Sequence, residues 1–217
     1  MVTLDLVSIL SLLMIVTSLA VFGWRNIKQA AYIYVIQTIL LITIFAVLAQ
    51  KYNAPELMSW AIIGFFLKVI LVPYILIKLI RKLNVTIEEE PVEGFFVSPI
   101  IAIAFSLATA MMLYPILKEF SLLKEDIPLI ASITVFMIGI FGLILRKNII
   151  KQIMAFCLFE NGSHLTLALM AYKSPEIVDV GILTDAIFAV IIMSILAMRY
   201  YKYFGSLDVT KASNLKG

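Results

Sequence analysis

Four ionisable side chains lie inside long apolar stretches of this sequence, at Lys68, Glu160, His164 and Asp185. Groups of these types can hold and pass protons. Histidine exchanges protons near neutral pH, and the proton affinity of a buried carboxyl group changes with the distance of a nearby cation. A charge at the centre of a bilayer costs about 2.5–3.5 kcal/mol on insertion scales. These four residues are therefore candidates for a proton-transfer pathway.

The spacing along the chain places these candidates at similar depths. Glu160 and His164 are one helical turn apart and share a helix face. From a rise of about 1.5 Å per residue, we expect Lys68 at the depth of Glu160. Asp185, on the helix that follows, is expected at the depth of His164. The order of the helices in the bundle decides whether Lys68 reaches Glu160, and the sequence leaves that order open.

Neutral polar residues and a proline accompany the candidates. Asn161 and Ser163 are expected to orient water molecules in the pathway, and Gln37 is a further polar candidate. Pro73 follows Lys68 by about one turn and should loosen the backbone there and free carbonyl groups. One histidine and two carboxylates on two helices are too few to indicate a metal site. No catalytic or cofactor-binding residue is predicted.

Each candidate also has a purely structural interpretation. Glu160 could be a protonated interhelical hydrogen-bond donor, and His164 a packing residue. Asp185 could satisfy the start of its own helix, and Lys68 could extend to the membrane surface. The single cysteine, Cys157, is predicted to be a small buried hydrophobic residue.

The elements that carry these residues are predicted to be transmembrane helices. Hydrophobic residues make up 63% of the chain and charged residues 14%, with a mean hydropathy of +1.07, which excludes an ordinary soluble domain. Apolar runs of roughly 20 residues can cross a bilayer. The sequence therefore predicts an all-α polytopic membrane protein with seven helices, over Leu4–Phe22, Ala30–Ala49, Leu57–Ile80, Phe95–Leu117, Ile127–Leu145, Ile149–Tyr172 and Ile177–Tyr203.

Positive charge predicts the orientation of these helices. One set of connections contains twelve Lys and Arg residues and the other only four, which with Lys68 accounts for all 17. By the positive-inside rule the amino terminus lies outside and the carboxyl terminus in the cytoplasm. The net charge of +3 reflects this bias and gives no indication of nucleic-acid binding. The acidic cytoplasmic loop Lys82–Gly94 is predicted to be a solvated linker, with docking of a cytoplasmic partner as the alternative.

Two further patterns concern packing and ancestry. Gly139 and Gly142 are predicted to permit close helix packing. The turn after the first helix resembles the turn after the fifth, so that Asn26 aligns with Asn148 and Gln37 with Glu160. Two halves that run in the same direction, separated by a linker helix, would form a parallel repeat of the kind found in transporters.

The last third of the chain resembles the small three-helix membrane subunit of respiratory complex I and of multi-subunit Na⁺/H⁺ antiporters. The resemblance is carried by LILRKNIIKQIMAFCLFENGSHLTLAL, by GILTDAIFAVIIMSILAMRYYK and by the closing SLDVTKASNLKG. It implies a three-helix module at 127–217, preceded by a four-helix membrane region at 1–126. Glu160 and Asp185 then take the places of that subunit's two helix glutamates. Aligning Asn161 with the family asparagine puts Cys157 at the first of these positions, so the acid is displaced by about one turn.

The whole chain, with FFLKVILVPYILIKLIRKL in its third helix, is similar to the hydrogenase-4 component E family. This resemblance implies a subunit of the plasma membrane of a prokaryote that contributes buried charges to proton or sodium translocation. It also implies a nickel–iron site and iron–sulfur clusters in partner subunits and no cofactor in this chain. The implied partners are membrane lipid, large antiporter-like membrane subunits, a membrane anchor subunit for the cytoplasmic arm, and cytoplasmic hydrogenase subunits.

Two other interpretations are open from the sequence. The chain could belong to a complex I-like or antiporter complex that has no hydrogenase, and the coupling ion could be H⁺ or Na⁺. In a different functional class, it could be a structural membrane anchor for a cytoplasmic redox arm. The electron donor and any involvement of a quinone are likewise left open.

Overall fold

The computed structural model of the chain describes residues 5–88, 94–173 and 176–214, with the side chains of 176–186 and 213–214 outside the description. Apart from two single-pair bridges, the regular structure in this part is helical. The elements are α1 (Leu6–Gly23), α2 (Ile27–Lys51), α3 (Pro55–Gly64), the π-helical segment η1 (Phe65–Leu71), α4 (Val72–Leu83), α5 (Gly94–Phe120), α6 (Asp126–Leu145), α7 (Ile149–Ala171), α8 (Glu176–Phe204) and the short 3-10 helix η2 (Val209–Asn214).

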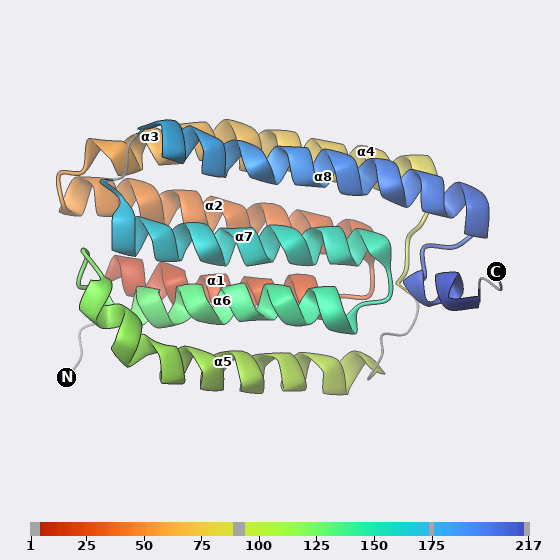
Figure 1. Cartoon of the computed structure of the whole chain (residues 1–217), viewed down its shortest axis with the longest axis horizontal. Coiled ribbons are helices and arrows are strands. Elements are labelled where there is room, and N and C mark those ends of the chain that lie inside the picture. The colour runs from red at the N-terminus through yellow and green to blue at the C-terminus, as the bar shows by residue number, and fades with distance from the viewer. Residues whose placement is uncertain (1–4, 89–93, 174–175, 215–217) are drawn as a thin grey trace.

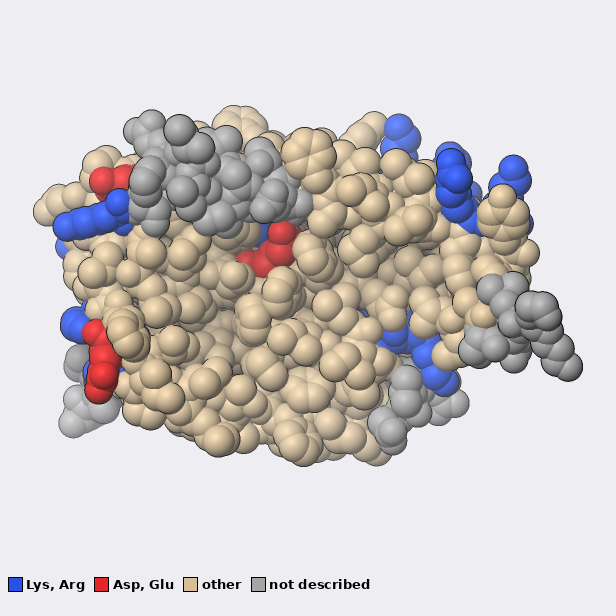
Figure 2. Space-filling view, viewed as in Figure 1, with Lys and Arg blue, Asp and Glu red and all other residues tan. Residues whose placement is uncertain are grey.

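The predicted seven-span architecture is confirmed. In the described residues, seven helices are long and apolar enough to cross a membrane, with α3, η1 and α4 forming one span from Pro55 to Leu83. Each predicted span coincides with one of them. Figure 2 shows Lys and Arg side chains gathered at the end of the bundle where α4 and α8 finish, and side chains of both signs at the opposite end.

The helices form two layers with a linker helix along one edge (Figure 1). One layer contains α1, α2 and the α3–α4 span, and the other contains α6, α7 and α8. Across the layers α1 packs on α6, α2 on α7, and α4 on α8. The remaining helix, α5, lies against α6 and α1. This arrangement places the second helix of each layer at the centre of the bundle.

Two turns at the predicted cytoplasmic end are built alike. Asn26 caps α2, and Asn148 caps α7, each by accepting a backbone hydrogen bond from the first turn of its helix. Each turn also pairs with the segment that follows the third helix of its layer, through the antiparallel bridges Asn26–Ile87 and Asn148–Asp208. This shared construction agrees with the duplication that the sequence predicts.

Glycines bring α6 and α7 into close contact. A Cβ atom on Gly139 would overlap the backbone of Phe159, and one on Gly142 would overlap the side chain of Ala155. A Cβ atom on Gly162 of α7 would likewise overlap the backbone of α6. The prediction that Gly139 and Gly142 serve close packing is therefore confirmed.

A polar layer divides the apolar interior into two parts. One buried cluster includes Tyr34 and Leu158, and the other includes Leu41 and Leu165, one to two turns further along the same two helices. Between the clusters lie buried polar side chains from three spans, namely Gln37, Thr38, Lys68, Glu160, Asn161 and His164.

Candidate functional site

Lys68 enters the interior from a helical segment of unusual geometry. In η1 the apolar residues Phe65, Phe66 and Ile70 are exposed on the outside of the bundle, and Lys68 alone is buried, with 2% of its surface exposed. The π-helical segment ends directly before Val72 and Pro73, where the missing proline N–H interrupts the regular hydrogen-bond ladder. π-Helical turns are frequent at functional sites.

The Lys68 ammonium group contacts two side chains of α7. Its Nζ atom donates a hydrogen bond of 2.9 Å to Oδ1 of Asn161 and lies 2.5 Å from Nδ1 of His164. An ammonium group has only donors, so His164 accepts through Nδ1 when Lys68 is charged, and the imidazole is then neutral with its proton on Nε2. In the alternative arrangement a protonated Nδ1 donates to a neutral amine. One proton can therefore occupy either side of this contact.

Asn161 connects this contact to the other central helix, α2. Its Nδ2 atom donates to Oε1 of Gln37 at 2.7 Å and to Oγ1 of Thr38 at 3.2 Å. Because both donors of the amide are engaged with α2, its oxygen is directed at Lys68. Gln37, Thr38 and Asn161 are fully buried. The hydrogen-bond network thus joins three spans at mid-length: the third span, through η1, and the helices α2 and α7.

Glu160 lies beside this network, on α7 and 8% exposed. It is near enough to attract the Lys68 ammonium electrostatically, and the thiol of Cys157 and the hydroxyl of Tyr34 also lie within its field. The hydrogen bonds of Lys68 go to Asn161 and His164, so Glu160 acts on the lysine at longer range. Cys157 is a buried free thiol, as predicted, one turn from Glu160 on the same helix.

The structure does not bring every predicted site residue to this network. Ser163 is exposed on another face of α7, in a hollow that it shares with Phe136 of α6 and Leu113 of α5. Asp185 belongs to α8, but its side chain lies outside the described residues. Among the described side chains, no group of three or more His, Cys, Asp and Glu residues could hold a metal ion.

A second buried charge cluster, which the sequence did not predict, lies at the predicted cytoplasmic end. Glu88 accepts a hydrogen bond of 3.2 Å from Arg146, and the Nζ of Lys151 lies 3.8 Å from the same carboxylate oxygen. These three side chains are at most 1% exposed. The guanidinium of Arg146 also lies over the Phe22 ring, 4.1 Å from its centroid. The prediction that the acidic loop is a solvated linker is therefore wrong for Glu88.

This cluster also caps the carboxyl-terminal end of α1. Lys151 donates hydrogen bonds to the carbonyl oxygens of Val21, at 2.5 Å, and Trp24, at 3.0 Å. Cations at these positions are favourable because the last carbonyls of a helix have no partner within it. Burial raises the pKa of the Glu88 carboxyl, against the opposing effect of Lys151 and Arg146. Burial likewise lowers the pKa of Arg146, against the effect of Glu88.

The sequence gives only weak indications of Glu88 and Thr38, two buried polar residues that it did not predict as part of a site. Glu88 is one of four glutamates in a loop at the same end as the basic turns, but nothing in the sequence says which glutamate turns inward. Thr38 is adjacent to Gln37, yet threonine is common in membrane helices, where its hydroxyl returns to the preceding turn. In this structure it does so as well, to the carbonyl of Tyr34 at 3.0 Å.

Comparisons with known proteins cover both the last third and the whole of the chain. The sequence profile of the family described as NADH-ubiquinone/plastoquinone oxidoreductase chain 4L matches residues 127–217. An uncharacterized protein of Mycobacterium tuberculosis is 31% identical over 86 residues, which are 40% of this chain and 39% of that protein. No solved structure matches the chain significantly.

Full-length relatives establish the family. The proteins named hydrogenase-4 component E from Escherichia coli (strain K12) and from Shigella flexneri are each 37% identical to this chain over 206 residues. These residues are 94% of this chain and 94% of each relative. The chain covers nearly the whole of these relatives, and its seven spans and buried charges are compatible with a membrane component. The chain belongs to the hydrogenase-4 component E family.

Proposed function

We propose that this chain is a membrane subunit of an energy-converting hydrogenase complex, in which it helps to move protons, or sodium ions, across the plasma membrane. The names of its relatives and the match to a complex I subunit family support this assignment. Electron transfer would then take place in partner subunits that hold a nickel–iron site and iron–sulfur clusters. The other partners would be large antiporter-like membrane subunits and an anchor subunit for the cytoplasmic arm.

The contact between Lys68 and His164 is the observation that carries this proposal. Two groups that both exchange protons lie 2.5 Å apart in the middle of the membrane-spanning region. Transfer of the shared proton from Nζ to Nδ1 converts an ammonium and a neutral imidazole into a neutral amine and an imidazolium. The positive charge thereby moves from η1 to α7, the helix that carries Glu160.

Glu160 is the group that would respond to this movement. A carboxyl group holds its proton less tightly when a cation is close. In the proposed cycle, the position of the shared proton decides whether Glu160 keeps or releases its own. Asn161 holds the lysine in place through the amide network with Gln37, so that the cation moves by proton transfer while the backbone stays fixed.

Replacement of Glu160 by Gln tests this role in the assembled complex. Glutamine keeps the size and hydrogen-bonding capacity of the side chain and removes its titration. We expect hydrogen evolution by the cytoplasmic subunits to continue, while coupled proton uptake into inverted vesicles falls to background. Glu119→Gln, at an exposed position near the end of α5, is the matched control. An assembled Glu160→Gln complex that still pumps like the wild type would instead favour a structural anchor.

A second assignment, a complex I-like or antiporter complex without hydrogenase, is favoured by the family match over residues 127–217. The metal content of the complex that co-purifies with this chain in mild detergent separates the two. Nickel together with hydrogen evolution supports the hydrogenase assignment. Large membrane subunits without nickel support the second assignment and overturn the first.

A further inference from the structure

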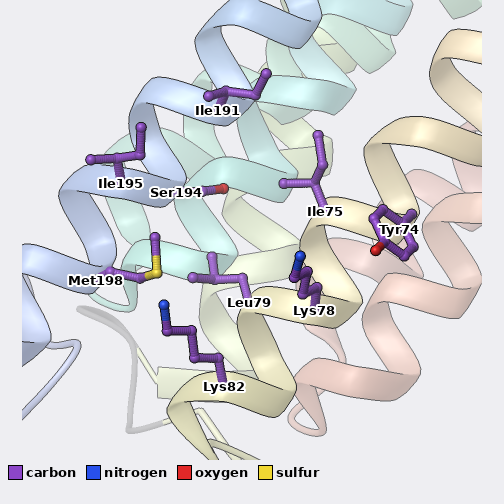
Figure 3. Close-up of a pocket in the computed structure, with 9 residues that line it drawn as sticks. All are labelled: Tyr74, Ile75, Lys78, Leu79, Lys82, Ile191, Ser194, Ile195 and Met198. Atoms are coloured by element: carbon purple, nitrogen blue, oxygen red, sulfur yellow. The ribbon is translucent and has the colours of Figure 1, made fainter.

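A groove runs between α4 and α8 on the outside of the bundle. It encloses a hollow of about 310 Å³. Ile75 and Leu79 of α4 and Ile191 and Ile195 of α8 form apolar walls on its two sides (Figure 3). In the part of α8 from Ile187 to Phe204, only 17% of the residues are buried within this chain, so most of this part of the helix meets lipid or another subunit.

One end of the groove is strongly basic. Lys78 and Lys82 are one helical turn apart on α4, and Figure 3 shows that both ammonium groups reach into the hollow. An adjoining hollow is lined by Lys82 together with Arg199 and Lys202 of α8. None of the described residues that line the two hollows is acidic, and no described residue forms an ion pair with Lys78 or Lys82.

A hydroxyl group lies deeper in the same hollow. The Oγ atom of Ser194 is buried and has no hydrogen-bond partner among the described residues. A serine in a membrane helix usually donates to the carbonyl of the preceding turn. Figure 3 shows Ser194 at the level of Ile75, further from the ends of the helices than Lys78 and Lys82. The groove thus presents cations at its mouth, a hydroxyl below them, and apolar walls toward the middle of the membrane.

We propose that this groove binds one anionic phospholipid of the cytoplasmic leaflet. The phosphate would lie between Lys78 and Lys82, the glycerol and ester oxygens near Ser194, and one acyl chain along the isoleucines of α4 and α8. Basic pockets between transmembrane helices on the cytoplasmic side are suited to such headgroups. The basic end of the groove is the end that the positive charges of the sequence assign to the cytoplasm.

The positive charge of the groove favours a lipid as its occupant, and not a helix of a neighbouring subunit. A helix seated here would have to bring acidic side chains to four cations at the depth of the lipid headgroups. A leaflet that contains anionic lipid supplies the phosphates at that depth. The hydroxyl of Ser194 adds one polar position at the level where the ester groups of a phospholipid begin.

Retention of lipid by the intact complex tests the proposal. The complex is placed in nanodiscs with equal amounts of phosphatidylglycerol and phosphatidylcholine, extracted in mild detergent and released into a native mass spectrometer, where lipid on this subunit is counted. The variants are Lys78→Gln with Lys82→Gln, and Ser194→Phe, which fills the hollow without a change of charge. The control is Lys28→Gln with Lys211→Gln, two exposed cations on the same side of the membrane.

We expect wild type and control to retain one phosphatidylglycerol and little phosphatidylcholine. The double lysine variant should bind it roughly 30-fold more weakly, since the loss of each lysine near the membrane surface raises the dissociation constant roughly fivefold. Ser194→Phe should lose the lipid as well. Equal retention of both lipids, or an equal loss in the control, would overturn the proposal. A further result would also overturn it: the wild-type complex binds no phosphatidylglycerol, and the Ser194→Phe complex loses a neighbouring membrane subunit. The groove would then be a contact surface for that subunit.

Discussion

The Nζ atom of Lys68 and the Nδ1 atom of His164 are 2.5 Å apart and belong to two spans that are separated by 96 residues in the sequence. Neither atom is at a helix end, and both side chains are almost completely buried. Because the two atoms are so close, the protonation state of each residue determines the protonation state that the other can adopt.

Lys68→Arg should assemble but fail to translocate protons. Arginine keeps the positive charge and the donors toward Asn161, but it does not release its proton in proteins. Proton uptake by inverted vesicles, compared at equal hydrogen evolution, measures the effect. Lys28→Arg, at an exposed position in the first turn of α2, is the control. Translocation at the wild-type rate in Lys68→Arg would show that Lys68 supplies only a fixed charge.

His164→Gln should flatten the pH dependence of translocation between pH 5 and pH 8. Glutamine can still accept a hydrogen bond from Lys68, but it has no titration in the range where histidine changes its charge. The rate of proton uptake across this range is the measurement. An unchanged profile, with a lower or equal rate at every pH, would assign His164 to packing.

Asn161 and Gln37 should behave as a coupled pair. Asn161→Leu leaves the buried amide oxygen of Gln37 without its donor and removes one acceptor of Lys68, which should cost about 1–3 kcal/mol. In the double variant with Gln37→Leu, the loss should be smaller than the sum of the single losses. Thermal denaturation of the purified complex measures this double-mutant cycle. Additive losses would mean that the 2.7 Å contact contributes no interaction energy.

Glu88→Gln should destabilise the predicted cytoplasmic end. Arg146 and Lys151 would remain buried without the carboxylate, and loss of one partner of a buried ion pair costs about 3–5 kcal/mol. A lower midpoint of thermal denaturation and faster proteolysis near residues 84–88 are the expected observations. Hydrogen evolution by the partner subunits gives an independent readout of assembly. A variant as stable as Glu119→Gln would show that the cluster is dispensable.

The sequence predicted the architecture well because long apolar runs have few alternatives to membrane helices. It also predicted that Lys68 and Glu160 lie at one depth, since the rise of a helix converts residue number into height. It could not predict the hydrogen bonds of Lys68, which depend on the packing of η1 against α7. Ser163 differs from Asn161 by two positions, about half a turn, and this small offset directs it to another face of α7.

The charges at the predicted cytoplasmic end could not be assigned to a buried cluster from the sequence. Arg146 and Lys151 look like ordinary positive-inside residues in the sequence, and Glu88 looks like one of several solvated acids. Only the antiparallel bridge between Asn26 and Ile87 brings that loop over the end of α1 and buries its glutamate. Pairing of distant short segments leaves no periodic pattern in the sequence.

The inward-facing lysine of η1 also has a consequence for the biogenesis of the protein. The third span is synthesised before its partners, because Asn161 and His164 follow Lys68 by 93 and 96 residues. At ribosomal speeds of about 5–20 residues per second, this span waits roughly 5–20 seconds before the helix that receives its cation exists. During that time the lysine lacks both of these hydrogen-bond partners, and its charge costs about 2.5–3.5 kcal/mol at the bilayer centre, so the third span gains its full stability in the membrane only after the sixth has been inserted.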